Sequence, residues 1–227
     1  MHIEPQIVAK VNIEGKYIDI DNIKCKQTYR AFISLLKQDP TAVHKWCETY
    51  DIDQDTWKYY FMLPFNVCID TELQSLQYKI IHRFFPCNYT LSIWFDDIQS
   101  LCQLNGCTGK VDTLQHYFFY CTSVAEFWNA FMRFWRIQVG FSFALNELDV
   151  IFGVLNPLNY NQIDVLNYCI FYAKLYIYKC KRDVKNICLF EFLILLKNRI
   201  NTLHYLAVMQ NKENEFRNKW SISYEKF

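Results

Sequence analysis

The sequence has few of the residues that make tight turns, with only five glycines and five prolines among 227 residues. A β-sandwich or barrel needs a turn about every ten residues, so this composition argues against both. Hydrophobic residues make up 52% of the chain and aromatic residues 18%, well above the content of a disordered chain. The sequence therefore predicts a mainly α-helical protein that folds over nearly all of its length.

The chain also lacks an excess of charge of either sign. It has 24 basic and 23 acidic residues, for a net charge of +1. Proteins that bind nucleic acid tightly on their own are usually much more basic. A nucleic-acid-binding role would therefore have to depend on a local basic patch.

No hydrophobic stretch is typical of a secretion signal or a membrane span. The amino terminus, MHIEPQIVAKVNIEG, has no apolar run long enough for a signal peptide. The most apolar passages, YCIFYAKLYIYKC and ICLFEFLILL, are too short or are interrupted by Lys174 and Glu191. We expect an intracellular chain with no membrane partner, and we expect these passages to be buried helices.

An intracellular location is reducing, so the ten cysteines are not expected to form a disulfide framework. Free cysteines are usually buried and pack as small apolar side chains. Seven of the ten have no metal-ligand spacing and are expected in the core: Cys25, Cys47, Cys68, Cys87, Cys169, Cys180 and Cys188.

Periodicity divides the chain into three expected segments. Residues 1–98 form an amino-terminal arm and a helical subdomain, 99–136 a metal-binding knuckle and the helix after it, and 137–227 a carboxyl-terminal helical subdomain. Near the start, VNIEGKYIDIDNI alternates apolar and polar residues, which favours a short strand or an extended arm. From Lys24 onward helical patterns dominate.

The last segment predicts a pair of long helices. Apolar residues recur there at spacings of three and four, in one set at Ile163, Leu166, Ile170, Ala173 and Ile177, and in another at Leu189, Leu193, Leu196, Ile200, Leu203 and Ala207. The two helices are expected to pack antiparallel across a turn near Asp183. A short polar helix, KENEFRNKW, follows, and Phe216 and Trp220 would anchor it.

One cluster indicates a metal site: Cys102, Cys107, His116 and Cys121 lie within 21 residues. The dipeptide Asn105-Gly106 favours a tight turn, which lets both flanking sulfurs point inward. On an ideal α-helix, residues five apart point about 140° away from each other. A single straight helix therefore cannot present both His116 and Cys121 to one ion.

The sequence offers a break between these two ligands. Asp112-x-x-Gln115 and Ser123-x-x-Glu126 both match the pattern that starts a helix, which places Cys121 at the junction. The order and spacing then predict a Cys-Cys-His-Cys knuckle that binds Zn²⁺. This zinc would be structural, because four protein ligands leave no open position. The alternative is four unrelated core residues of a cysteine-rich chain.

Several stretches resemble a known family. These are LQYKIIHRFFPCNYTL, the cysteine and histidine cluster, the pair Asp112-Thr113, HYFFYC and Phe127-Trp128. Together they resemble the reverse-transcriptase zinc-binding segment at the carboxyl end of the second-frame polyprotein of LINE-type, non-LTR retrotransposons. The resemblance extends over roughly residues 55 to 222. It implies a zinc-binding module that helps to hold template RNA or target DNA near the upstream reverse-transcriptase region.

The family's usual ligand pattern is C-x2-C-x8-H-x4-C. Its last three ligands correspond to Cys107, His116 and Cys121, whereas its first falls on Leu104 and has to be supplied by Cys102.

Catalytic motifs are missing. The polymerases of this family carry an aromatic residue, one spacer and two aspartates, and IWFDDIQ has Asp96-Asp97 after a different order of residues. We interpret these acids as a helix end. The sequence has no nucleophile in a strand-turn-helix context and no glycine-rich phosphate loop, so we expect a protein that is not an enzyme.

Two functions follow from these observations. The first is binding of RNA or single-stranded DNA through the passage KLYIYKCKRDVK, where cations and aromatic rings could contact phosphates and bases. The residues proposed for this contact are Lys174, Tyr178, Lys179, Lys181, Arg182 and Lys185. The second is a structural or interaction module that packs on the rest of a polyprotein and has no separate activity. The near-zero net charge favours the second.

Overall fold

The computed structural model describes residues 10–13, 16–19, 25–26, 29, 40–104, 106–107, 109–140, 144–156 and 160–220. Contacts divide the chain into two compact units, Met1–Thr41 and Ala42–Phe227. The described part of the first unit holds strands β1 (Lys10–Ile13) and β2 (Lys16–Asp19), which pair antiparallel. The alternating pattern predicted one short strand or an arm here, and the structure has two short strands instead. The helix expected after Lys24 lies mostly outside the described residues.

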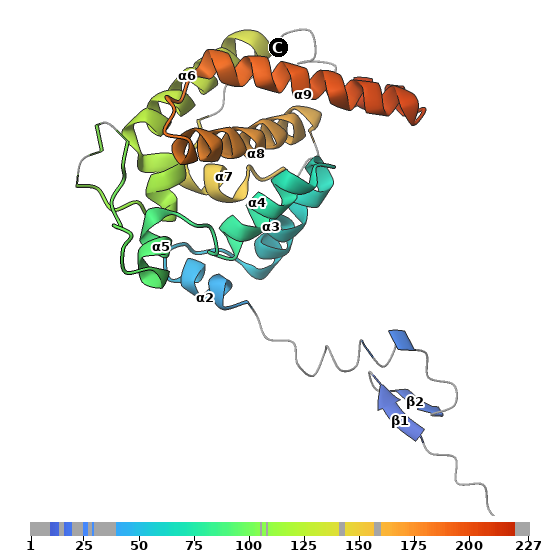
Figure 1. The fold of residues 1–227 in the computed structure, drawn as a ribbon. Helices are drawn as coiled ribbons and strands as arrows, with labels where there is room; N and C mark the ends of the chain where they lie inside the picture. The colour runs from blue at the N-terminus through green and yellow to red at the C-terminus, as the bar shows by residue number, and fades with distance from the viewer. Residues whose placement is uncertain are drawn as a thin grey trace, which may run out of the picture. The chain divides into compact units, whose positions relative to one another are not determined.

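The rest of the described chain is helical (Figure 1). The elements are α2 (Thr41–Cys47), α3 (Gln54–Val67), α4 (Thr71–Ile81), α5 (Asn88–Trp94), the π-helix η2 (His116–Tyr120), α6 (Thr122–Val139), α7 (Glu147–Phe152), α8 (Asn161–Arg182), α9 (Leu189–Met209) and α10 (Glu213–Trp220). The prediction of a mainly α fold is confirmed. Core residues come from all three expected segments, and the expected boundaries near 98 and 136 stay a prediction.

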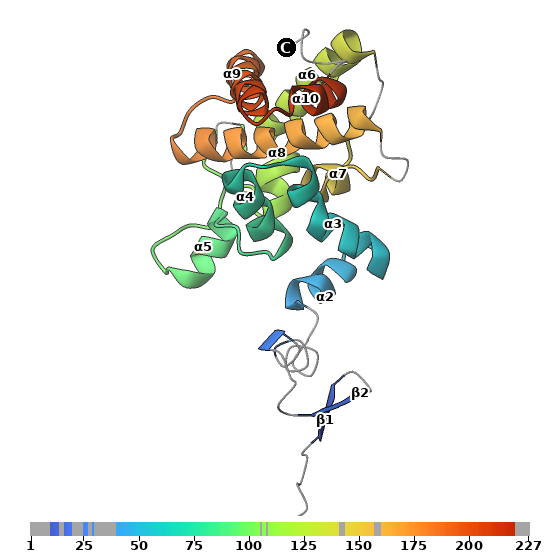
Figure 2. The ribbon, with the colours of Figure 1, turned by 90° about the vertical axis from the view of Figure 1, so that its right-hand side faces the viewer.

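Helix α8 forms the centre of the second unit. It packs against α3 and α4 on one side and against α9 and α10 on the other (Figure 2). Fourteen of its 22 residues are buried, as expected for a helix that is covered nearly all round. Among the described helices, none is both long and apolar enough to cross a membrane.

The antiparallel pair of long helices is confirmed. Helix α8 ends at Arg182 with Asp183 as its cap, and α9 returns from Leu189. The hydroxyl of Tyr176 fixes the turn, because it donates to the backbone oxygen of Cys188 and accepts from the Cys188 amide, both at 3.0 Å.

Helix α10 is anchored as predicted. Phe216 and Trp220 are both buried, and their rings stack with centroids 5.9 Å apart.

The expectation for the seven remaining cysteines is only partly correct. Four of them are buried: Cys68, Cys87, Cys169 and Cys180. It is wrong for Cys25, Cys47 and Cys188, which are exposed. Cys47 ends α2 and Cys188 immediately precedes α9, and helix ends of this kind lie where the chain turns at the surface.

Candidate metal centre

The loop of residues 101–111 closes on itself and brings two cysteines together. An antiparallel bridge joins its two ends, and the Cys102 amide donates to the backbone oxygen of Lys110 at 2.8 Å. The Lys110 amide donates in turn to the backbone oxygen of Cys107 at 3.0 Å. Gly106 has a φ of +86°, which favours glycine. The residue before it in the predicted turn lies outside the described residues.

The other two ligands are brought together by the π-helix η2, which begins at His116. The Cys121 amide donates to the His116 backbone oxygen at 2.9 Å. This i to i+5 bond is the defining contact of a π-helix, and it places Cys121 one full turn after His116. A side-chain bond supports the start of this turn, because the Thr113 hydroxyl accepts from the His116 amide at 3.2 Å. The predicted break at Cys121 is confirmed, since α6 begins at Thr122.

The four predicted ligands converge in space. One ligand atom from each of Cys102, Cys107, His116 and Cys121 lies within 4.8 Å of all the others, and all four residues are buried. The Sγ atoms of Cys107 and Cys121 are 3.5 Å apart. Two sulfurs bound to one tetrahedral zinc at 2.3 Å would be separated by about 3.8 Å. The spacing of these sulfurs is therefore close to that of a shared metal ion.

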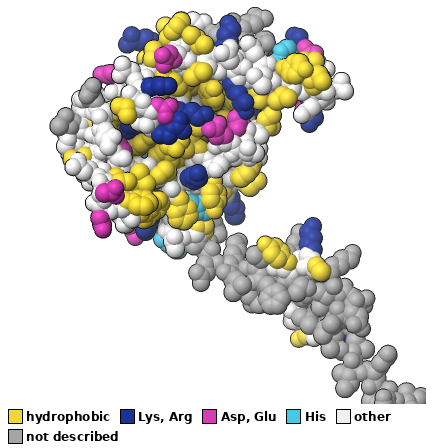
Figure 3. Space-filling view, in the orientation of Figure 1, with side chains coloured by type: hydrophobic (Ala, Val, Ile, Leu, Met, Phe, Trp, Pro, Cys, Tyr) yellow, Lys and Arg dark blue, Asp and Glu magenta, His cyan; other side chains and the backbone are white. Residues whose placement is uncertain are grey.

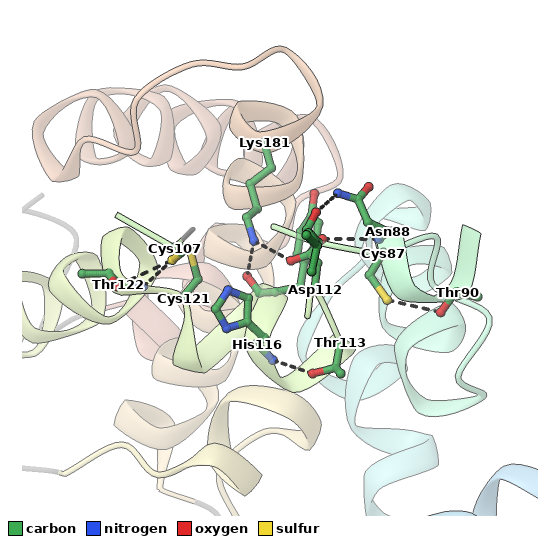
Figure 4. A network of polar contacts seen from close by, with 12 residues as sticks. Cys87, Asn88, Thr90, Cys107, Asp112, Thr113, His116, Cys121, Thr122 and Lys181 are labelled. Atoms are coloured by element: carbon green, nitrogen blue, oxygen red, sulfur yellow. Dashed lines mark hydrogen bonds and ion pairs between the residues drawn. The ribbon is translucent and has the colours of Figure 1, made fainter. Parts of the chain in front are cut away.

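The Nε2 atom of His116 gives an independent test of metal binding. This atom is buried, and it has no hydrogen-bond partner in the described part of the chain. Buried polar atoms are nearly always paired, so an unpaired one needs an explanation. A metal ion bound to Nε2 would supply the missing partner. The four converging residues therefore fit a metal ion, and Figure 4 shows three of them, Cys107, His116 and Cys121.

A buried ion pair borders the centre on the side of α8 (Figure 4). The Lys181 ammonium lies 3.3 Å from Asp112 Oδ1 and also donates to the backbone oxygen of Tyr117 at 3.3 Å. It sits 3.9 Å from the centre of the Tyr117 ring. The second oxygen of Asp112 accepts from the Asn88 amide at 3.3 Å. This pair could not be predicted from local sequence patterns, because its partners are 69 residues apart.

Burial and neighbouring charges set the protonation of the ligands. Burial, with the nearby Lys181, lowers the pKa of His116, so the imidazole is in the neutral form that binds metals. Burial raises the pKa of the Cys102 thiol, and it raises that of Cys121 to about 12.

Cys107 behaves differently from the other two thiols. Burial raises its pKa, but hydrogen bonds from Thr122 and from the neighbouring thiols outweigh burial, and the net shift is downward. The Thr122 amide donates to Cys107 Sγ at 3.3 Å. Outer-shell bonds of this kind orient the ligands of metal sites.

Two of the six residues proposed for nucleic-acid contact are not at the surface. Lys174 is 0% exposed, and the side chain of Lys181 is only 6% exposed. The prediction that Lys174 and Lys181 contact phosphates is therefore wrong. The physical reason is that α8 is covered on opposite sides by other helices, so its lysines point into the protein as well as away from it.

The other four proposed residues, Tyr178, Lys179, Arg182 and Lys185, lie at or just after the end of α8. Their cations form ion pairs with nearby acids. Lys179 is 3.0 Å from Glu72, and Asp183 pairs with Arg182 at 2.7 Å and with Lys185 at 3.9 Å. Figure 3 shows basic and acidic side chains side by side on this face.

The ring of Tyr178 is occupied within the protein. It packs edge-on to Phe85 with centroids 5.5 Å apart and lies under the Arg182 guanidinium. The surface around the end of α8 is therefore close to neutral, and its aromatic ring is only partly available to a ligand.

The acids of IWFDDIQ lie where the sequence placed them. Helix α5 ends at Trp94, and Asp96 and Asp97 are exposed in the turn that follows. Their interpretation as a helix end is confirmed.

No protein-family model matches this chain, and no curated protein matches it at a significant level. Function is therefore inferred from the centre itself. Three buried thiols and one buried imidazole converge there and can hold a metal ion.

Proposed function

We propose that Cys102, Cys107, His116 and Cys121 bind one structural zinc ion in a non-catalytic helical module. The convergence of the four buried ligands carries this proposal, and the unpaired Nε2 atom of His116 supports it. Thiolate and imidazole ligands favour zinc over magnesium or calcium, which prefer oxygen. Four protein ligands leave no position for a substrate or an activated water. The ion would therefore stabilise the fold and take no part in a reaction.

Zinc would crosslink the 101–111 loop to the segment formed by η2 and the start of α6. Two ligands come from the 101–111 loop, one from the start of η2 and one from the residue before α6. Metal-binding free energy at such sites contributes directly to folding. Zinc would hold the loop against the first turn of α6.

Metal analysis tests this proposal. Protein purified without chelator is expected to contain about one zinc per chain. Cys188→Ser is a matched control, because this thiol is exposed and is not among the four converging ligands, and it is expected to keep the zinc. Protein that is fully folded and free of metal would rule out the proposal.

We also propose that the module is a carboxyl-terminal segment of the LINE type and has no polymerase activity. One support is the spacing of Cys107, His116 and Cys121, which matches the family's pattern. Another is Thr113, from the pair Asp112-Thr113 that resembles the family, because its hydroxyl accepts a hydrogen bond from the His116 amide. Primer extension with magnesium or manganese is expected to give no product. An extension product that is lost when Asp96 and Asp97 are both changed to Asn would overturn this proposal.

We further propose that the chain acts inside the cell and binds RNA or single-stranded DNA weakly, close to an upstream reverse-transcriptase region. Cysteine thiolates that bind a metal have to stay reduced, which suits a reducing compartment. Fluorescence anisotropy with a labelled single strand over a series of salt concentrations tests nucleic-acid binding. A log-log salt dependence with a slope of about −0.7 per phosphate contact is expected.

A second candidate is an interaction module without its own activity. The observation that favours it is the matching of Lys179, Arg182 and Lys185 by acids, together with the burial of two further lysines of the same passage. This candidate predicts no binding of single strands even at low salt, so the same titration distinguishes the two.

A further inference from the structure

A groove lies along α6, and two of the residues that line it, Phe119 and Tyr120, directly precede Cys121 in the sequence. Its volume is about 770 Å³. Residues of η2, of α6 and of the stretch before α7 line it: Phe119, Tyr120, Ala125, Trp128, Asn129, Met132, Arg133, Arg136, Ala144 and Leu145. None of these ten lining residues is acidic.

One wall of the groove carries a polar and cationic stripe. Asn129, Arg133 and Arg136 are spaced by four and then three residues on α6, which places them on one face of the helix. All three are exposed. Within the described ranges, neither arginine has a carboxylate within ion-pair distance. Glu126, the one acid of α6, lines a neighbouring hollow, which Asn129 and Arg133 line as well.

An exposed aromatic ring from η2 lines the same groove. Tyr120 is 58% exposed, and its hydroxyl donates to Glu147 Oε2 at 2.7 Å. Its ring lies edge-on to Phe119 with centroids 5.1 Å apart. These two contacts hold the ring in place while leaving it open to a ligand.

We infer that this groove binds a segment of single-stranded nucleic acid. Arg133 and Arg136 would contact successive phosphates, since guanidinium groups pair well with phosphate oxygens. Tyr120 would stack on a base, as aromatic side chains do in proteins that bind single strands. The inference rests on the proposed nucleic-acid binding. It locates that binding at the α6 groove and not at the end of α8, whose surface is nearly neutral.

An acidic peptide is the competing occupant, because arginines also pair with carboxylates. The exposed ring favours the nucleic acid, since every base offers a flat face for stacking. Competition between the two ligands therefore forms one arm of the test.

The experiment measures binding of a fluorescently labelled oligo-deoxythymidine strand to the full chain over a salt series. Changing Arg133 and Arg136 to Gln together is expected to make the log-log salt slope shallower by about 1.4 units, which corresponds to two lost phosphate contacts. The matched control changes Lys179 and Arg182 to Gln, which removes the same charge from the end of α8, and it is expected to leave the slope nearly unchanged.

Two substitutions of Tyr120 test stacking. Tyr120→Leu removes the flat ring and is expected to weaken binding about tenfold at every salt concentration. Tyr120→Phe keeps the ring and loses only the bond to Glu147, and it is expected to bind within about twofold of the unchanged protein. Circular dichroism of each variant checks that the helices are intact.

Each contrary result has a distinct meaning. If the unchanged chain fails to bind the strand at low salt, the proposed nucleic-acid binding itself fails. If the chain binds the strand but the salt slope becomes shallower with the Lys179 and Arg182 substitutions and not with those of Arg133 and Arg136, the groove is not the binding site, while nucleic-acid binding itself stands. If poly-glutamate binds as tightly as the strand, the assignment of the groove to nucleic acid is wrong.

Discussion

The Lys181 ammonium at the end of α8 lies 3.3 Å from the carboxylate of Asp112, and Asp112 precedes the candidate metal ligand His116 by four residues. The side chains are only 6% and 3% exposed. The pair therefore connects the central helix to the segment that carries the metal ligands. A buried ion pair costs free energy to desolvate, and removing one partner leaves the other charge buried and unmatched.

Lys181→Met is therefore expected to lower the free energy of unfolding by about 3 kcal/mol. The matched control is Lys179→Met, whose ion pair with Glu72 is 45% and 57% exposed, and it is expected to cost less than about 1 kcal/mol. Urea unfolding measures both. Equal effects of the two substitutions would show that the buried pair has no special role.

Loss of a metal ligand is expected to act locally. If the proposed ion is bound, Cys121→Ser should increase amide hydrogen exchange between residues 101 and 128, because the loop and η2 would lose the ion that they share. The α8–α9 pair packs through its own apolar residues, so its exchange is expected to change little. Uniform loss of protection over both regions would contradict a local role for the metal.

The sequence predicted the features that depend on local periodicity and spacing. The apolar repeats of Ile163–Ile177 and of Leu189–Ala207 identified α8 and α9, because helix faces follow directly from spacings of three and four. The four residues that converge as candidate metal ligands were identified from their order, and the break at Cys121 from two helix-start patterns.

The sequence could not predict how His116 and Cys121 come together. On an α-helix, residues five apart point about 140° away from each other. The chain resolves this with a π-helical turn, a conformation too rare to be inferred from residue type. Local spacing also gave no indication that Lys174 and Lys181 point inward, because their burial depends on helices distant in sequence.

The packing around Gly153 gives a sharp test of the core. This residue has a φ of +106°, and an added Cβ would collide with Leu63 and lie 3.1 Å from Asn167 Oδ1. Gly153→Ala is therefore expected to destabilise the protein by about 2–4 kcal/mol. Gly140 also has a positive φ, of +76°, but an added Cβ there meets nothing within 4 Å. Thermal unfolding should show a cost of only about 1 kcal/mol for Gly140→Ala.

Lys174 is an unusual core residue. Its ammonium donates to the side-chain oxygen of Gln77 and, at 3.1 Å, to the backbone oxygen of Ile151, and it lies 4.6 Å from the centre of the Phe171 ring. Among the described residues, no carboxylate is within ion-pair distance of it. Burial holds its pKa well below the ordinary value of 10.5.

This lowered pKa predicts a stability that rises with pH. Between the folded-state pKa of Lys174 and 10.5, only the unfolded chain holds the extra proton, so higher pH favours the folded state by up to about 1.4 kcal/mol per pH unit. Lys174→Met removes this proton. The stability of the unchanged protein relative to this variant is therefore expected to increase with pH and to level off above 10.5. Urea unfolding of both proteins at several pH values measures the difference, in which the titrations of groups that do not interact with Lys174 largely cancel. A difference that does not change with pH would mean that Lys174 keeps its charge in the core.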